Sequence, residues 1–290
     1  MIALAENSYG KSSVRVMKVK RDRPSHSVLE WKVEVLLSGD FESCFISGDN
    51  RAILPTDTMK NTVYSRARES QAECIEDFAL ELAQFFLSRN PQVQEVAIQI
   101  ASTSWEHASL EGKPHPSTFL RGSSEEETTT VTCAQGGRAS VTSGLDHLII
   151  LKTAQSGFEG FVRDSLTTLP ETDDRLLGTS LRARWTYRSY QDYRDYHSGA
   201  LPFGQLRSKL RAALLDAFAG HDSKSVQHTL YAMAQAALEA APEILDVELA
   251  MPNKHCLLVD LSRFGQTNPN EIFVPTDEPY GNIVARIVRK

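Results

Sequence analysis

Two stretches rich in Val and Leu, residues 14–20 and 28–37, lie close together near the start of the chain. Pro24 and Ser25 stand between them. Apolar runs with many β-branched residues, separated by a short polar segment, are typical of two strands that pair through a loop. The pattern therefore predicts a β-hairpin with a longer connecting loop.

The next hydrophobic pattern has the period of a helix. Within residues 72–88 the apolar side chains recur at intervals of three and four, and Asn90-Pro91 follows. This spacing places them on one helix face, and proline disfavours helix in the residue before it. We predict an amphipathic helix whose buried face consists of Ile75, Phe78, Ala79, Leu82, Phe85 and Phe86.

Strand and helix patterns then continue in the same order. Residues 93–100 alternate between apolar and polar side chains like a half-buried strand, and residues 116–133 are its predicted partner. The second half is predicted to contain strands at about 138–153 and 180–188, helices at about 204–219 and 224–240, and strands at 244–251 and 256–261.

A displacement of 151 residues makes one half of the chain resemble the other. Duplication explains such matches, and so does coincidence between two amphipathic helix–strand units. Two strands, helices and two more strands, given twice, predict an α+β fold of two ββααββ units, residues 1–135 and 136–290, with antiparallel sheets and helices on one face. The matching pairs are Leu82/Met233, Ala83/Ala234, Gln84/Gln235, Leu87/Leu238, Pro91/Pro242, Val93/Ile244, Glu95/Asp246, Val96/Val247 and Ile98/Leu249.

Composition narrows the class of protein. The chain has 290 residues, of which 41% are hydrophobic and 23% charged, and its formal net charge is −6. These values are typical of a folded globular protein and disfavour electrostatic binding to nucleic acid or to an anionic membrane. The sequence contains no run of about 18 apolar residues, which is the length that a membrane-spanning helix needs. The N-terminus lacks a signal-peptide pattern, the four Cys are scattered and no peroxisomal tripeptide ends the chain, so we expect a cytoplasmic protein with reduced thiols.

No common catalytic or cofactor-binding motif is present. The sequence has no G-x-G-x-x-G or P-loop glycine pattern, no G-x-S-x-G elbow and no pair of His at i, i+4. We therefore predict no metal site and no bound cofactor.

Single residues leave the chemistry open. Lys11 is a candidate base if it is buried, and a solvated charge if it is not. Arg175 follows the acidic stretch 171–174, where a surface ion pair is the simpler explanation. His255 suits a structural role as well as a catalytic one, and Phe158 suits a core position as well as a stacking platform.

Two predicted helix starts have unpaired backbone N–H groups that attract anions or carbonyl oxygens. Asp222-Ser223-Lys224-Ser225 precedes one helix, and Thr56-Asp57 stands at the entry to a turn or short helix. Ordinary helix capping is the alternative explanation for both.

Several strings nevertheless occur together in an order that resembles the urate oxidase (uricase) family. They extend over nearly the whole chain, and the Thr-Asp-x-x-Lys-Asn-Thr and Pro-Asn-Lys-His strings are specific. The strings are Tyr9-Gly10-Lys11, Thr56-Asp57-Thr58-Met59-Lys60-Asn61-Thr62-Val63-Tyr64, Gly112-Lys113-Pro114-His115-Pro116, Leu151-Lys152-Thr153, Ser156-Gly157-Phe158-Glu159-Gly160-Phe161, Thr167-Thr168-Leu169-Pro170-Glu171-Thr172, Ser225-Val226-Gln227 and Met251-Pro252-Asn253-Lys254-His255.

The resemblance implies the tunnelling fold (T-fold), in tandem repeats. It also implies a homotetramer in which each active site lies between subunits. The reaction it implies belongs to purine catabolism: urate, O2 and water give 5-hydroxyisourate and H2O2 without a cofactor. A non-catalytic T-fold protein that binds purines or pterins is the alternative.

The resemblance also implies roles for individual residues. Phe158 stacks on the purine, while Arg175, Gln227 and the Val226 N–H bind one edge of it. Thr56 and the Asp57 N–H, from a neighbouring subunit, meet the opposite edge. Asn253, with Thr56, holds O2 or water above the ring. Lys11, Thr56 and His255 form a proton relay. Three positions depart from the family pattern, His107, Gly122 and Ser180, and none is a site residue.

Overall fold

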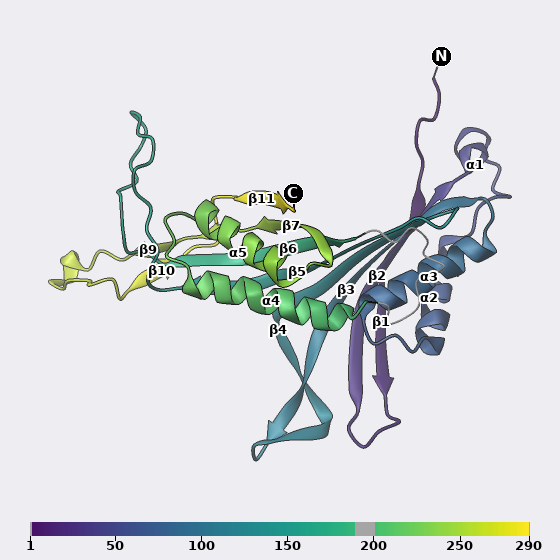
Figure 1. The fold of residues 1–290 in the computed structure, drawn as a ribbon, viewed down its shortest axis with the longest axis horizontal. Helices are drawn as coiled ribbons and strands as arrows, with labels where there is room; N and C mark the ends of the chain where they lie inside the picture. Colours follow the sequence, from purple (N-terminus) through teal and green to yellow (C-terminus); the bar gives the residue numbers. More distant parts are fainter. Residues whose placement is uncertain (1, 189–200, 290) are drawn as a thin grey trace. The chain divides into compact units, whose positions relative to one another are not determined.

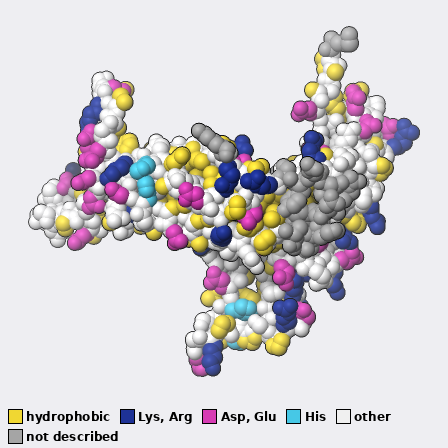
Figure 2. All heavy atoms as spheres, viewed as in Figure 1, with side chains coloured by type: hydrophobic (Ala, Val, Ile, Leu, Met, Phe, Trp, Pro, Cys, Tyr) yellow, Lys and Arg dark blue, Asp and Glu magenta, His cyan; other side chains and the backbone are white. Residues whose placement is uncertain are grey.

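A computed structural model describes residues 2–188 and 201–289 and divides the chain into two compact units (Figure 1). The first unit consists of Met1–Gly144 and Trp185–Leu206, and the second of Leu145–Arg184 and Arg207–Lys290. No helix in the described ranges is long and apolar enough to cross a membrane. Acidic and basic side chains are interspersed on the face seen in Figure 2.

The first unit contains the predicted hairpin and strand pair. Strands β1 (Tyr9–Lys20), β2 (Ser27–Gly39), β3 (Val93–Leu110) and β4 (Lys113–Ala134) are consecutive antiparallel neighbours. The strand predictions are confirmed, and β3 and β4 extend beyond the predicted ranges into a long hairpin. Helix α1 (Glu42–Ser47), α2 (Thr56–Glu69) and α3 (Ile75–Arg89) complete this part.

Helices α2 and α3 pack on one face of this sheet, α2 against β1 and α3 against β3 and β4. The predicted apolar stripe of α3 is buried, and the Trp31 ring stacks on Phe78 at 4.8 Å. Phe85 is the one half-buried member of the predicted stripe, where the guanidinium groups of Arg66 and Arg89 cover its ring.

Helix α2 is longer than the turn or short helix predicted there. Its 14 residues bury only Met59, Val63 and Ala67, which repeat every four positions. So narrow a stripe within a polar segment gives little hydrophobic periodicity.

The second unit repeats the helix–strand order. It contains the remainder of β5 (Ala139–Lys152), most of β6 (Leu177–Tyr187), the C-terminal part of α4 (Phe203–Gly220), α5 (Val226–Ala240) and β7 (Ile244–Ala250). Both α5 and β7 begin 151 residues after α3 and β3, and α3 and α5 each have 15 residues. The displacement found in the sequence therefore relates equivalent elements. The assignment of repeats to residues 1–135 and 136–290 stays a prediction.

The end of the chain differs from the predicted strand at 256–261. Only β9 (Cys256–Leu258) forms there, and it pairs with β10 (Phe273–Pro275) in a separate two-stranded sheet. The strand that pairs with β7 is β11 (Val284–Val288), while β8 (Asn253–Lys254) pairs with β6. The segment between β9 and β10 contains the short 3-10 helix Ser262–Phe264.

Two of the departures from the family pattern have structural explanations. His107 Nδ1 lies 2.7 Å from the His115 carbonyl oxygen, and its ring lies 4.5 Å from that of Phe119. His107 therefore braces the β3–β4 hairpin. Gly122 lies where an added Cβ would come within 3.3 Å of the Ser104 side chain, beside a register irregularity in β3. Nothing in the structure explains Ser180.

Candidate functional site

The N-terminus of α5 lies beside the loop that carries Phe158. The Ser225 hydroxyl caps the helix by accepting from the His228 N–H at 3.1 Å. The Ser223 carbonyl accepts from the Gly157 N–H at 2.8 Å, and Ser223 N–H donates to the Gln155 carbonyl at 2.9 Å. These backbone bonds fix residues 155–157 against the segment that leads into α5.

Glycine suits the close backbone approach in this loop. A Cβ at Gly157 would lie 3.1 Å from the Thr172 oxygen and 3.1 Å from the Asp173 Cα. Because the two segments approach so closely, Phe158 N–H donates to the Thr172 carbonyl at 2.6 Å. The Ser-Gly-Phe string thus brings the Phe158 ring to the segment that contains Arg175.

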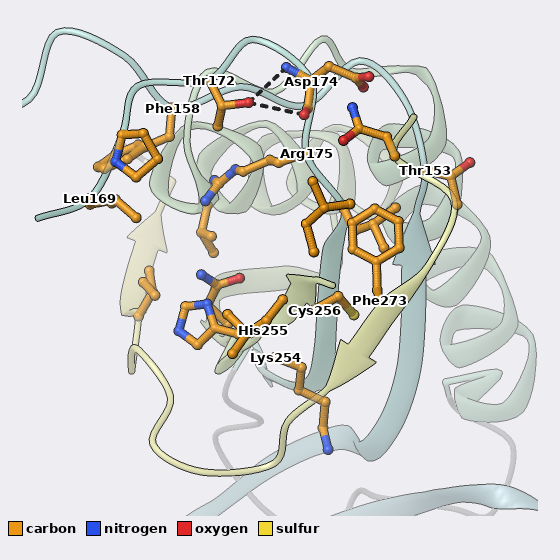
Figure 3. A pocket seen from close by; sticks show the side chains of 18 of the residues that line it. Thr153, Phe158, Leu169, Thr172, Asp174, Arg175, Lys254, His255, Cys256 and Phe273 are labelled. Carbon is orange, nitrogen blue, oxygen red and sulfur yellow. Dashed lines mark hydrogen bonds between the residues drawn. The ribbon is translucent and has the colours of Figure 1, made fainter. Parts of the chain in front are cut away.

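Arg175 turns back toward Phe158. The backbone N–H of Arg175 donates to the Ser156 carbonyl at 2.8 Å, and the guanidinium carbon of its side chain lies 5.3 Å from the centre of the Phe158 ring. Figure 3 shows these two side chains on one side of a cavity and His255 on the other.

The electrostatics of Arg175 are unusual for a residue that follows an acidic stretch. Burial lowers the pKa of its guanidinium, yet arginine remains charged at neutral pH. Its Nε and Nη2 atoms are buried and have no hydrogen-bond partner in the described parts of the chain. The surface ion pair offered by the sequence is therefore not formed within the described residues, and the N–H groups of Nε and Nη2 remain for a ligand.

The cavity has a volume of about 500 Å³. Six of the residues singled out from the sequence line it: Phe158, Arg175, Val226, Gln227, Asn253 and His255. Its other lining residues are Thr153, Leu169, Pro170, Thr172, Asp174, Leu176, Lys254, Cys256, Leu257, Leu258, Asn270, Phe273 and Ile283.

Backbone pairing positions Asn253 and its neighbours. Asn253 N–H donates to the Gly281 carbonyl at 2.8 Å, and β8 pairs with β6. Lys254 forms an ion pair with Asp277 at 2.9 Å, which draws its ammonium toward an exposed carboxylate. The His255 carbonyl accepts from the Thr276 N–H at 2.9 Å. The backbone on both sides of the His255 side chain is thereby held in place.

The remaining predicted site residues, Lys11, Thr56 and Asp57, belong to the first unit. Lys11 lies in β1 immediately before a bulge, where the register with β2 shifts and Ser13 adopts a φ of 58°. A bulge redirects the side chains around it. Gly10 precedes Lys11 because a Cβ there would lie 1.8 Å from the Val35 carbonyl oxygen.

Tyr9 connects this strand to the start of α2, a contact that sequence reasoning did not predict. Its hydroxyl accepts from the Leu54 N–H at 2.8 Å and donates to the Leu54 carbonyl at 3.1 Å. Thr56 and Asp57 are the first two residues of α2, and Pro55 at the cap supplies no side-chain hydrogen bond. Their backbone N–H groups are thus not capped by a side chain. A tyrosine beside Gly-Lys carried the only signal, and its partner is 45 residues away.

Phe273 and Asn270 also line the cavity without having been predicted. Phe273 begins the three-residue strand β10, and Asn270 lies in the loop before it. Neither belongs to a stretch long enough to show a hydrophobic period. Within residues 2–188 and 201–289, no group of three or more His, Cys, Asp or Glu side chains is arranged to hold a metal ion.

Comparison with known proteins gives one consistent result. Residues 7–132 and 141–284 match the family model described as uricase. Uricase-2 of Phaseolus vulgaris is 39% identical over 296 residues, covering 98% of this chain and 95% of that protein. Uricase of Arthrobacter globiformis is 38% identical over 289 residues, covering 100% and 91%. The crystal structure of uricase from Arthrobacter globiformis has a TM-score of 0.91 at 37% identity and covers 100% of this chain and 96% of that one.

Proposed function

The chain belongs to the uricase family, and on that premise we propose that it is a urate oxidase. It oxidises urate with O2 and water to 5-hydroxyisourate and H2O2, without a bound cofactor. Relatives from plants, bacteria and mammals carry the name uricase, which favours this function over a non-catalytic purine- or pterin-binding protein.

The observation that carries the proposal is that the buried guanidinium group of Arg175 has N–H donors without partners in the part of the chain that the structure describes. Among the described residues its Nε and Nη2 are buried without acceptors, and its guanidinium carbon lies 5.3 Å from the centre of the half-buried Phe158 ring. A buried unpaired donor costs about 1–3 kcal/mol. A flat anion with carbonyl and ring-nitrogen acceptors removes this cost, because a guanidinium fork binds two acceptors in one plane. Urate has this chemistry.

The rest of the cavity suits the same ligand. The half-buried Phe158 ring, which stacks on the Phe161 ring at 4.8 Å, is the aromatic surface on which we expect a purine to stack. Gln227 is the second residue of α5 and supplies both a donor and an acceptor, while the Val226 N–H at the helix N-terminus adds a donor. Together these groups bind one edge of urate and orient its plane.

Oxidation requires that O2 be held against C5 of urate. Asn253, in β8 at the wall of the cavity, is suited to hold O2 or water above the ring, together with Thr56. Urate transfers two electrons to O2, a C5 hydroperoxide forms and H2O2 leaves. Water then adds at C5, so the oxygen of the new hydroxyl group comes from water.

Protons must move in each of these steps. Lys11, Thr56 and His255 form the proposed relay, and a positioned acid–base group typically contributes about 10²–10⁴-fold to a rate. The relay takes the proton from water and delivers protons to the leaving peroxide. Positioning and electrostatic stabilisation of the urate anion supply the rest.

We further propose a homotetramer whose active sites lie between subunits. Lys11, Thr56 and Asp57 belong to one compact unit and the cavity to the other. Strand β1 pairs only with β2, and β11 only with β7, in the described parts of the chain. Open strand edges are sites where another chain pairs. A second copy that brings Thr56 and Asp57 to the cavity completes the site. The cytoplasmic location stays a prediction of the sequence.

The experiment compares the amounts of urate consumed, O2 consumed and H2O2 released. Purified protein is treated exhaustively with a chelator, and urate absorbance, O2 uptake and H2O2 release are followed together. We expect equal amounts of urate and O2 consumed and H2O2 released. Binding of a non-oxidisable urate analogue without turnover would overturn the enzymatic function. Light scattering on the same sample tests the tetramer.

A further inference from the structure

Both oxygens of the Asp57 carboxylate are engaged inside the first turns of α2. Lys60 Nζ lies 2.5 Å from Oδ1, and Asn61 Nδ2 donates to Oδ2 at 3.0 Å. Lys60 and Asn61 lie three and four residues after Asp57, positions that face it on a helix. These three residues form the Asp57 clamp.

A second ammonium lies within the electrostatic range of this carboxylate. The hydrogen bond and charge of Lys60 lower the pKa of Asp57, and Lys11 adds a smaller electrostatic contribution in the same direction. Lys11 Nζ has no hydrogen bond or ion pair within the described residues. The two hydrogen bonds between the Tyr9 hydroxyl and the Leu54 backbone hold the start of β1 against the residues that lead into α2. Lys11 in β1 and Asp57 in α2 therefore belong to adjoining segments, and the carboxylate pairs with Lys60.

The partner that Asp57 takes matters for the reaction. The Asp57 side chain is 69% exposed, so it is free to turn if its helix partners are lost. An ammonium that is paired with a carboxylate is held away from other acceptors. Pairing of Lys11 with Asp57 would thus withdraw it from the neighbouring Thr56 hydroxyl.

We propose that Lys60 is a positioning residue that, with Asn61, keeps the Asp57 carboxylate away from Lys11. Lys11 then stays available to Thr56, while the backbone N–H of Asp57 stays available to the substrate. The inference rests on the proposed function, because it assigns Lys60 a part in the same proton relay. It explains why a charged side chain next to Thr56 does not capture the nearby lysine.

The test is a double-mutant cycle on the full tetramer. Lys60→Met removes the ammonium from the clamp, and Asp57→Asn removes the charge that would capture Lys11 but keeps the backbone N–H. For Lys60→Met we expect kcat to fall at least about tenfold, with the Kd of a non-oxidisable urate analogue changed less than about twofold. In the Asp57→Asn background, the same substitution should change kcat less than about twofold.

Two further variants separate positioning from folding. Glu69→Gln breaks the Arg66–Glu69 ion pair, which has the same i, i+3 spacing on the same helix, and it should leave kcat as in wild type. Lys60→Arg keeps a cation that can hold Asp57 and should retain most of the turnover. If Lys60→Met does not assemble, Lys60→Gln takes its place in the cycle.

The outcomes distinguish this inference from the function on which it rests. If wild type does not oxidise urate, the proposed function falls and the inference falls with it. If wild type turns over and Lys60→Met does so equally well, the inference alone is overturned. An equal loss of kcat in the Asp57→Asn background would also overturn it, since Lys60 would then act without the carboxylate.

Discussion

Helices α3 and α5 begin at equivalent points of the two units, but their second residues lie in opposite environments. Glu76 in α3 is completely buried and accepts a hydrogen bond from the Ser143 hydroxyl at 2.5 Å. Ser143 also lies 3.3 Å from the Thr129 hydroxyl. Gln227 in α5 is exposed and lines the 500 Å³ cavity.

We call the start of α3 closed, because the side chain of its second residue is buried in the protein, and the start of α5 open, because the side chain of its second residue lines a cavity. In the first unit, the Ser143 hydroxyl of β5 donates to Glu76, the second residue of α3, and the Thr129 hydroxyl of β4 lies against Ser143. In the second unit, Phe158 and Arg175 line the same cavity as Gln227, and the Nε and Nη2 donors of Arg175 have no acceptor in the part of the chain that the structure describes. Two units with the same helix–strand order therefore need not carry the same site, because side-chain chemistry decides whether a helix start binds a ligand.

Replacement of Lys11 has the largest expected effect and tests what the first unit contributes to the reaction. Lys11→Met should lower kcat by about 10²–10⁴-fold, because it removes an acid–base group from the relay. Binding of a urate analogue should change little, since Lys11 does not dock the purine. Comparable losses in kcat and in analogue affinity would contradict the relay.

Arg175→Lys tests the donors of the second unit. Lysine keeps the charge but cannot present two coplanar N–H groups. We expect analogue affinity to fall by about 10–100-fold, which corresponds to about 1.5–3 kcal/mol for hydrogen bonds to a charged group. Isothermal titration calorimetry measures this, and an unchanged Kd would disprove the edge-binding role.

Gln227→Glu makes the open helix start chemically like the closed one. A carboxylate placed beside an anionic purine repels it, so the Kd of the analogue should rise about tenfold. Gln227→Asn is the matched control for side-chain length without charge. Equal effects of the two variants would mean that loss of the amide contacts, and not the added charge, weakens binding in Gln227→Glu.

Ser143→Ala should produce the smallest effect and confine it to the first unit. Loss of the hydrogen bond to buried Glu76 should destabilise the protein by about 1 kcal/mol. Thermal unfolding measures the change, and KM for urate should stay as in wild type. A raised KM with an unchanged melting temperature would place the closed helix start in the binding machinery.

The regular half of each unit could be predicted from sequence because its side chains follow a period. The stripe of α3, the alternation in β3 and their match to α5 and β7 all come from local patterns. Helix α2 was underestimated because only Met59, Val63 and Ala67 are buried in it. The strand predicted at 256–261 is formed only at Cys256–Leu258, although most of that stretch is apolar, and β11, which pairs with β7, was not predicted.

The candidate site could be assembled only in part. The family strings assigned roles to Phe158 and Arg175, for which the residues alone gave a core position and a surface ion pair. The structure supplies the reason these residues meet, which is the close backbone contact at Gly157. Tyr9 and Phe273 could not be found, because each acts through a partner or wall that no local pattern encodes.

The central claim is that the helix start of the second unit binds urate and that of the first unit does not. The number of analogue molecules bound per chain tests this most directly, by calorimetry on the wild-type protein. The account predicts one per chain, with affinity weakened by Gln227→Glu. Two per chain, or one per chain that is insensitive to Gln227→Glu, would contradict it.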